Sequence, residues 1–486
     1  MLFLIAAALL GVAVVKMTGE EKFTKAVSKV FHEKFSADEI EIRGVSRERG
    51  KFTITRLAMI ADKGSFFTDL ELSNLICRRD FFVDFGKTWK PGIVEISKLN
   101  LSIRAGADSD EGARAISDVL FQDLGSIMPD AIHVANMSLK WGYTERSRGS
   151  ISESHMKAVP VADGWRLTFR GGTFTQNWLK NLLIEELDVV ITNKGIRFNK
   201  AVFSKSGGSV ILDQFEIVAG QRPMVSGQMK IKALNISSML PVVATPYVEG
   251  KISGEFTVSG STNTTKGIGF DGVVDLEEDD VITLRDRIPL FRALSVVDAN
   301  QTYRRVDFRI GSFYLEMGAE GLVVSNIKLF ADDVMTLTGK IVVRKPKSDE
   351  ELALDDGSEF FKEIVKSDET IDDFDISLRK AGRVSNKDEI GFQKEVDKSL
   401  FGRLEILRES RRAEEFETEK LSQSFRYEGE CNITLMKTAF DRALELKAAY
   451  PPTSESGRIP ITVPIKGLLY EVTADLANEI YEKGRK

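Results

Sequence analysis

Few residues in this sequence have the types and spacing that catalysis or metal binding requires. The chain contains three histidines, His32, His133 and His155, and two cysteines, Cys77 and Cys431. Histidine is the side chain that changes charge most readily near neutral pH, and cysteine thiolates bind metals or attack substrates. The two cysteines lie far apart and form no CxxC spacing, so they are either two buried thiols or one long-range disulfide.

Three local motifs resemble known binding or catalytic sites, and each lacks a residue that its chemistry needs. Residues 86–88 (Gly-Lys-Thr) resemble the end of a phosphate-binding loop, but Phe81 stands where that loop needs its first glycine. His32 is followed by glutamate, yet Ser36 replaces the second histidine of a zinc-peptidase helix. The acidic run at residues 277–280 lacks the spaced ligands of a calcium loop and is better explained as a turn between strands.

Serine, carboxylate and nucleic-acid chemistry have no recognisable site either. No serine lies in a G-x-S-x-G elbow, and no pair of carboxylates stands out as a glycosidase pair. Lys+Arg number 67 and Asp+Glu 73, and the net charge of −6 provides no overall basic field to attract nucleic acid. We therefore predict no catalytic residues, no metal or cofactor, no nucleic-acid partner, and a protein that is not an enzyme.

The N-terminal segment is apolar and indicates that the chain is targeted to a membrane. Residues 1–15 carry no charge, and the first charged residue is Lys16. As a helix at ~1.5 Å per residue this run reaches about 23 Å, against roughly 30 Å for a hydrocarbon core. We predict a membrane anchor or a cleaved signal over residues 1–17, and either one sends the rest of the chain across a membrane. Residues 18–38 are expected to form a short amphipathic helix.

From residue 39 onward the dominant pattern is an alternation of apolar and polar residues, which is typical of half-buried β-strands. In residues 251–258 (KISGEFTV), Ile252, Phe256 and Val258 fall on one side. Turns that contain glycine follow such runs at residues 171–172, 193–195 and 206–208. Further apolar sets on one side of their strands are Leu187, Val189 and Ile191; Met229, Ile231 and Ala233; Val306, Phe308 and Ile310; Phe374, Ile376 and Leu378; and Cys431, Ile433 and Leu435.

Many strands with short turns favour an antiparallel meander, because parallel strands need helical crossovers. Helical patterns are few, at residues 111–124, 288–296 and 439–449. We therefore expect a mainly β protein whose elongated antiparallel sheet curls into a groove over residues 39–344. Closing strands and a C-terminal helix would follow at residues 425–486. A closed sandwich or barrel with a filled apolar core remains the alternative.

Residues 345–424 differ from the rest and are predicted to be a charged, partly helical insertion. A long helix is expected over residues 387–421, where opposite charges at i,i+4 spacing are typical of a solvated surface. A helix that binds a partner is the second interpretation. In both cases one apolar stripe must dock on this chain or on a partner. That stripe contains Phe392, Val396, Leu400, Leu404 and Leu407.

Several segments occur in the order typical of one known family. After the apolar N-terminus come short strand-like segments at residues 43–45, 52–54, 70–72 and 94–96. Later segments are residues 288–294 (IPLFRAL), 308–315, 321–324, 333–341 with the spacing D-x-x-x-x-x-G, and 460–469 (PITVPIKGLL). This order resembles the AsmA-like family of bacterial envelope proteins, which is related to TamB and to bridge-like lipid-transfer proteins. The chain departs from the family after Gly467, where a proline is often found, and residues 345–419 match no family feature.

The resemblance implies a long antiparallel sheet with an apolar groove, anchored at the inner membrane with its bulk in the periplasm. Its partners would be a phospholipid or another acyl lipid, and each buried CH₂ contributes ~0.8 kcal/mol. The implied function is non-enzymatic: lipid binding or transfer between membranes, or support of outer-membrane assembly. An envelope scaffold that binds another protein is the alternative. The candidate groove residues are Ile252, Phe256, Val258, Val306, Phe308, Ile310, Phe374 and Ile376.

Overall fold

The structure is a computed structural model that describes most of the strand-forming sequence. The described residues are 37–48, 51–61, 67–77, 92–103, 129–141, 149–162, 164–176, 179–219, 223–240, 245–261, 268–277, 280–318, 321–344, 399–407, 426–468 and 475–484. The predicted anchor, nearly all of the predicted helix at residues 18–38, the predicted helix at residues 111–124, and Phe374 and Ile376 lie outside these residues.

The fold is mainly β, as predicted, and its strands belong to one sheet of 21 strands within the described part of the chain. The first twelve are β1 (Ala37–Glu48), β2 (Lys51–Ala61), β3 (Phe67–Cys77), β4 (Ile93–Ile103), β5 (Ala131–Trp141), β6 (Gly149–Val161), β7 (Gly164–Arg170), β8 (Thr173–Gln176), β9 (Leu179–Thr192), β10 (Gly195–Lys205), β11 (Gly208–Val218) and β12 (Met224–Asn235). The others are β13 (Val248–Ser261), β14 (Ile268–Asp275), β15 (Val281–Arg285), β16 (Arg305–Phe308), β17 (Ile310–Gly318), β18 (Gly321–Ala331), β19 (Met335–Arg344), β20 (Arg426–Leu435) and β21 (Ile459–Leu468).

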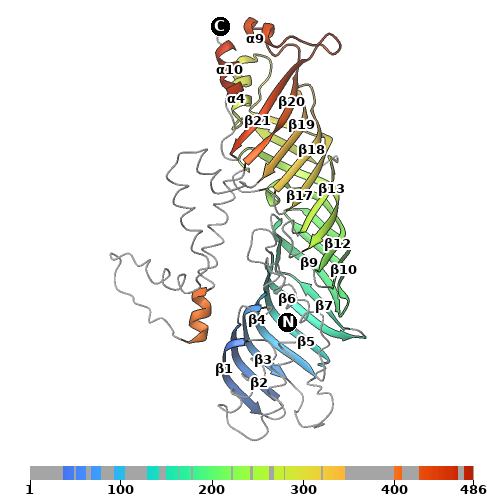
Figure 1. The fold of residues 1–486 in the computed structure, drawn as a ribbon, viewed down its shortest axis with the longest axis vertical. Coiled ribbons are helices and arrows are strands. Elements are labelled where there is room, and N and C mark those ends of the chain that lie inside the picture. The colour runs from blue at the N-terminus through green and yellow to red at the C-terminus, as the bar shows by residue number, and fades with distance from the viewer. Residues whose placement is uncertain are drawn as a thin grey trace, which may run out of the picture.

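The strands follow one another across the sheet nearly in chain order. Strands β1 to β6 pair in succession, and β7 and β8 both lie between β6 and β9. Strands β9 to β13 continue the succession, and β13 pairs with both β14 and β15. Strand β15 pairs with β16, whereas β14 pairs with β17, from which the order runs on to β21. The molecule is therefore long across its strands, with β1 near one end and β21 near the other (Figure 1).

One strand pair departs from the predicted antiparallel arrangement. Strands β4 and β5 are parallel, with Ile93 opposite Ala131 and Ile103 opposite Trp141. A parallel pair needs a connection long enough to return the chain to the starting end of the first strand. Residues 104–128 provide that length, and the helix predicted at residues 111–124 falls within them. The expectation of a purely antiparallel sheet is wrong at this pair.

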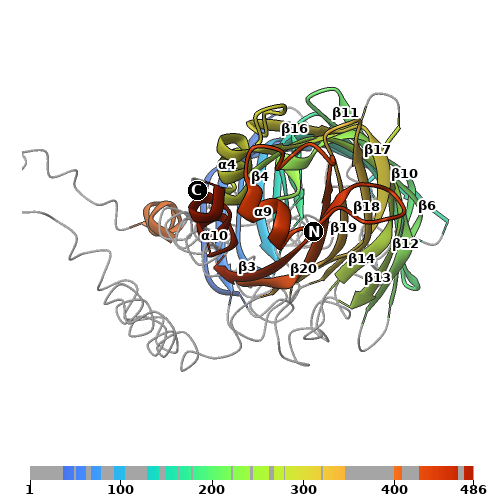
Figure 2. The ribbon, with the colours of Figure 1, turned by 90° about the horizontal axis from the view of Figure 1, so that it is seen from above.

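Most strands have one buried face and one more exposed, largely polar face, because successive side chains point to opposite sides of a sheet. On β13, Ile252, Phe256 and Val258 are buried, whereas Lys251 and Glu255 on the alternate positions are exposed. The buried side chains form one continuous hydrophobic cluster that extends from β1 to β21. We call this side of the sheet the buried face and the opposite side the charged face. Seen along the long axis, the strands pass around that axis (Figure 2).

Bulges shift the alternation within several strands, and one of them corrects a prediction. Met229 and Ile231 lie on the buried face as expected. Ala233 does not continue the pattern, because its φ of 48° and a register shift between Ile231 and Leu234 add one residue to β12. Leu234 takes the buried position instead and is fully buried.

The labelled helices are short. They are η1 (Ile236–Ser238), α4 (Pro289–Val297), α9 (Leu444–Ala449) and α10 (Asp475–Gly484). Helix α4 confirms the helix predicted at residues 288–296, with a proline in its first turn. Helix α9 starts later than predicted, because residues 437–442 form turns. Helices α4, α9 and α10 gather at the end of the sheet that holds β20 and β21 (Figures 1 and 2). Within the described residues, no helix could span a lipid bilayer.

A further helix, residues 400–407, belongs to the charged insertion and docks on β1 and β2. Leu400, Phe401 and Leu404 are buried together with Ala58 of β2, and Ile60 and Leu407 pack beside them. Ala58 and Ile60 lie on the charged face, on alternate positions to the buried Leu57 and Met59. The described part of the predicted apolar stripe therefore docks on this chain, while Phe392 and Val396 lie outside the described residues.

Candidate functional site

The buried face is the candidate functional site, because it contains most of the residues that the alternation of apolar and polar residues identified. On β13, Ile252, Phe256 and Val258 are buried side by side on alternate positions. On β16, Val306 and Phe308 are also buried, and Phe308 lies opposite Ile282 of β15. Because β13 pairs with β15, both groups belong to the same region of the sheet. The structure brings these five predicted residues onto one face.

Ile310 is the exception, and its predicted place on the same side as Phe308 is wrong. Its side chain is 63% exposed and lies opposite Phe330, which is 43% exposed. Strand β16 ends at Phe308, and the chain then changes partners, since β17 pairs with β14 and β18. The buried positions on β17 are odd-numbered, such as Phe313 and Leu315, and Ile310 therefore falls on the charged face.

Aromatic rings pack beside glycines on the buried face of β13 and β14. Phe256 meets Phe270 edge to face, with ring centroids 5.4 Å apart, an arrangement that favours the opposite charges of ring edge and ring face. Gly254 lies beneath the Phe256 ring, and a Cβ added there would lie 3.1 Å from two ring atoms. Gly272 stands opposite Phe256 in the strand pairing. The missing side chain at Gly254 gives the ring room to lie along the sheet, and the missing side chain at Gly272 lets the backbones of β13 and β14 approach closely.

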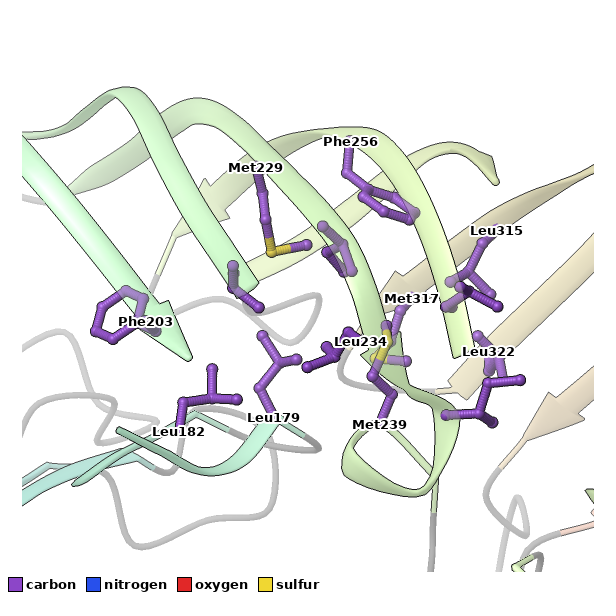
Figure 3. Close-up of a cluster of buried hydrophobic side chains, with 14 of the residues drawn as sticks. Leu179, Leu182, Phe203, Met229, Leu234, Met239, Phe256, Leu315, Met317 and Leu322 are labelled. Carbon is purple, nitrogen blue, oxygen red and sulfur yellow. The ribbon is translucent and has the colours of Figure 1, made fainter. Parts of the chain in front are cut away.

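The apolar cluster continues from this region to the middle strands (Figure 3). Leu179, Leu182 and Phe203 extend from β9 and β10 toward Leu234 and Met239 near η1. Sequence reasoning missed Leu179 and Leu182, because a bulge at Asn181, with a φ of 54°, interrupts the alternation between them. Hydrophobicity at both positions was the available signal, but the spacing of three residues concealed that they share a face.

Some apolar side chains on the buried face remain partly exposed. They pack against the main cluster without being covered by it. An apolar surface that neighbouring side chains do not cover can be buried favourably by an apolar ligand. These residues include Ile196, Phe198, Phe215, Phe270, Leu337, Ile341, Val463 and Ile465.

The charged face has a different chemistry, because cross-strand ion pairs line it. Lys230 of β12 lies 2.7 Å from Glu255 of β13, and the hydrogen bond from Lys230 lowers the pKa of Glu255. Glu186 accepts a hydrogen bond from Lys200, which likewise lowers its pKa. Exposed pairs of this kind contribute only about 0–1 kcal/mol each. They keep this face solvated.

The described residues provide little for bond-making chemistry. Both cysteines are free and buried, so the interpretation as two thiols is confirmed and a disulfide between them is not formed. Burial raises the pKa of Cys77 to about 12 and that of Cys431 to about 11, so both thiols are protonated at neutral pH. Within the described residues, no three His, Cys, Asp or Glu side chains gather closely enough to hold a metal ion.

Comparison with known proteins adds no assignment. No family model matches the chain, and no curated protein and no solved structure matches it.

Proposed function

We propose that this chain is a non-enzymatic lipid-handling protein of the AsmA-like kind, which holds acyl chains along its buried face. The observation that carries the proposal is the continuity of the apolar cluster, which includes residues of both β1 and β21. A long apolar strip matches an acyl chain better than a polar substrate. Because the backbone of each strand is already hydrogen-bonded to its neighbours, the strip needs no polar partner.

The physical basis of the proposal is the burial of methylene groups. Each buried CH₂ contributes ~0.8 kcal/mol, so about ten methylenes contribute roughly 8 kcal/mol before the loss of ligand freedom is subtracted. Such binding depends on length and apolar character and gives weak selectivity among acyl chains. This is the expected behaviour of a carrier that must also release its cargo.

Two features support an open groove in preference to a filled core. Partly exposed apolar side chains, such as Phe198, Ile341 and Val463, remain on the face that a filled core would cover completely. The strands also pass around the long axis of the molecule (Figure 2), as a curled sheet requires. In our proposal the curled sheet is a groove whose ligand covers these side chains.

The proposed location is the cell envelope, with an anchor in the inner membrane and the bulk in the periplasm. Its support is the uncharged run at residues 1–15 and the order of features that resembles AsmA-like proteins. In this position the groove would bind or transfer phospholipid between membranes, or support outer-membrane assembly.

A second candidate is an envelope scaffold that binds another protein. It is favoured by one pair of exposed apolar residues on the charged face, Ile310 and Phe330, which lie opposite each other on β17 and β18. The helix at residues 400–407 does not favour it, because Leu400 and Leu404 are already buried against β2.

Lipid extraction of the purified chain tests the leading proposal. We expect phospholipid to co-purify and to be identified by mass spectrometry. Ile341→Asp introduces a charge on the buried face of β19 at a partly exposed position and should abolish lipid retention. Lys340→Asp, at the neighbouring exposed position of the same strand, is the matched control and should retain it. Absence of lipid from the wild-type chain, or equal retention by both folded variants, would overturn the proposal.

A further inference from the structure

The buried face of β10 and β11 is covered toward one end of these strands and partly open toward the other. At the covered end, Ala201 and Phe203 of β10 and Val210 of β11 are each only 1% exposed. At the other end, Ile196 of β10 and Ile217 of β11 lie opposite each other. Both pack against the main cluster but remain partly exposed. The apolar face is therefore accessible to a ligand at this end of the two strands.

Two phenylalanines continue this accessible surface toward the middle of the strands. Phe198 and Phe215 are partly exposed, and their rings meet edge to face with centroids 4.7 Å apart. Gly227 of β12 lies beside Phe215, because a Cβ added there would lie 2.7 Å from the Cδ2 atom of the ring. We call the surface formed by Ile196, Phe198, Phe215 and Ile217 the open end of the buried face.

The opposite face of the sheet, which is charged elsewhere, is apolar at the same end of the strands. Val218 is the last residue of β11 and Met224 the first of β12, and the two lie opposite each other. Their side chains are 47% and 52% exposed. On the buried side, Ile217 lies opposite Val225. The tip of the β11–β12 hairpin is therefore apolar on both faces, and exposed apolar surface of this kind indicates a binding partner.

Basic side chains lie next to this apolar tip. The backbone amide of Ala219 donates a hydrogen bond of 2.9 Å to the backbone oxygen of Lys194, which holds the β9–β10 turn beside the end of β11. Lys194 is exposed, as is Arg197 on β10. Glu216 lies opposite Arg197 in the strand pairing and offsets its charge, which leaves the positive charge of Lys194 beside the tip. Apolar side chains beside a cation suit a bilayer surface, where lysine contacts anionic head groups.

We propose that the tip of the β11–β12 hairpin inserts into the surface of a lipid bilayer, and that the open end of the buried face receives an acyl chain from that bilayer. Insertion is shallow, about 5–10 Å, because the backbone groups of a turn need hydrogen-bond partners that hydrocarbon does not offer. This inference rests on the proposed lipid-handling function and adds to it the place where lipid enters the sheet.

The arrangement of the tip gives the acyl chain an apolar path into the sheet. Ile217 and Val218 are consecutive residues on opposite faces, so the inserted tip and the open end lie at the same level of the sheet. From Ile217 the apolar surface continues to Phe215 and Phe198. A chain that leaves the bilayer at the tip therefore stays in contact with apolar side chains, which avoids the cost of exposing its methylenes to water.

A fluorescent probe on the full-length chain tests the position of the tip. Met224→Cys is labelled with nitrobenzoxadiazole, while Cys77 and Cys431 are buried and should react poorly. The matched control is Gln228→Cys, which is exposed on the same face of β12 and lies four residues from the tip. Each labelled chain is reconstituted into vesicles of phosphatidylglycerol and phosphatidylethanolamine. Quenching is then measured with doxyl-labelled lipid and with aqueous iodide.

We expect the probe at residue 224 to lose fluorescence to doxyl lipid and to be protected from iodide, and the probe at residue 228 to show the reverse. Equal quenching by iodide at both positions would overturn the insertion of the tip. Protection of residue 224 from both quenchers would also overturn it, because the tip would then be covered by protein and not by lipid.

The rate of lipid uptake tests whether the tip is the place of entry. The double variant Val218→Asp, Met224→Asp should take up labelled phospholipid from vesicles roughly tenfold more slowly than the wild type, because a factor of this size corresponds to less than the burial of one apolar side chain. Ile211→Asp is the control. Ile211 is an exposed apolar residue on the same face of β11, seven positions before Val218, and its variant should keep the wild-type rate.

The outcomes separate this inference from the proposed function. Wild-type uptake by the folded double variant, with residue 224 quenched by iodide, would overturn the entry site and leave lipid handling intact. A wild-type chain whose tip is quenched by doxyl lipid but which takes up no lipid would overturn the proposed function and the entry site, and would leave only the insertion of the tip. Equal slowing by Ile211→Asp would overturn the assignment of entry to the tip.

Discussion

Arg403 donates hydrogen bonds to both carboxylate oxygens of Glu39, a residue 364 positions earlier in the chain. Glu39 lies on β1, near one end of the long sheet, whereas the insertion that contains Arg403 leaves from β19 and returns at β20, near the other end. The helix at residues 400–407, orange in Figure 1, lies beside β1. The insertion therefore links the two ends of the sheet through a contact on the charged face.

Exchanging the charges of this pair tests whether the contact holds the helix. Arg403→Glu places two carboxylates together and should increase hydrogen exchange of the amides at residues 400–407. Glu39→Arg should have the same effect, and the double exchange should restore protection. We expect about 1 kcal/mol or less per single variant, because the pair is exposed. Protection unchanged in both single variants would show that the ion pair does not stabilise docking.

Phe401 should contribute more to docking than the ion pair. The guanidinium carbons of Arg56 and Arg43 lie 3.9 Å and 4.8 Å from the centroid of its ring, and the ring is buried. Phe401→Ala removes two cation–π contacts and buried apolar area, and it should destabilise docking by about 2–4 kcal/mol. Glu405→Ala, at an exposed position of the same helix, is the control. Equal exchange rates in the two variants would contradict this ranking.

The apolar stripe of this helix could be predicted from the sequence, but its binding surface could not. Spacing alone identified Leu400, Leu404 and Leu407, because helical periodicity is a local property. Their partners Ala58 and Ile60 occupy positions on β2 that alternation assigns to the solvated side. A contact between segments so far apart depends on how the whole sheet places β2, and no local pattern contains that information.

Within the sheet, the sequence predicted correctly which side chains are buried wherever apolar and polar residues alternate regularly. The prediction was wrong where a bulge or a strand end interrupts that alternation. Ile252, Phe256 and Val258 were placed correctly because β13 is regular over them. The face predicted for Ala233 was wrong because nothing about an alanine in the sequence indicates that it will adopt a positive φ in a bulge. The face predicted for Ile310 was wrong because β16 ends two residues earlier, where the chain changes strand partners. These errors share one cause: bulges and partner changes depend on neighbouring strands.

Because Phe308 is buried and Ile310 is exposed, we expect substitutions to alanine at these two positions to differ widely in their effect on stability. Phe308→Ala leaves a cavity in the buried face and should lower the free energy of unfolding by about 3–5 kcal/mol. Ile310→Ala removes an exposed side chain and should change it by about 0.5 kcal/mol or less. Urea denaturation followed by circular dichroism measures both. Comparable losses in the two variants would mean that Ile310 is buried.

Asp307 should make stability depend on pH in the acid range. Burial raises the pKa of Asp307, but hydrogen bonds from Thr283 and Arg305 outweigh it and hold the pKa below its usual value. A carboxylate whose pKa is lowered in the folded state stabilises the fold above its unfolded pKa of about 3.9. That stabilisation is lost as the pH falls through the lower, folded pKa.

The substitution Asp307→Asn tests this dependence. The free energy of unfolding of the variant should change less with pH below about pH 4 than that of the wild type, because the variant lacks the titrating group. Asp275→Asn, at an exposed position on β14, should follow the wild-type curve. Parallel curves for wild type and Asp307→Asn would contradict the assigned role of Asp307.

The most direct test of lipid binding along the buried face is photo-crosslinking at three consecutive positions of β10. Ile196 and Phe198 lie on the buried face and are partly exposed, whereas Arg197 between them lies on the charged face. A photoreactive residue is placed at each position in turn, and the chain is irradiated in membranes containing labelled phospholipid. We expect lipid adducts at residues 196 and 198 and none at residue 197. Adducts at all three positions, or only at residue 197, would contradict a lipid-binding buried face.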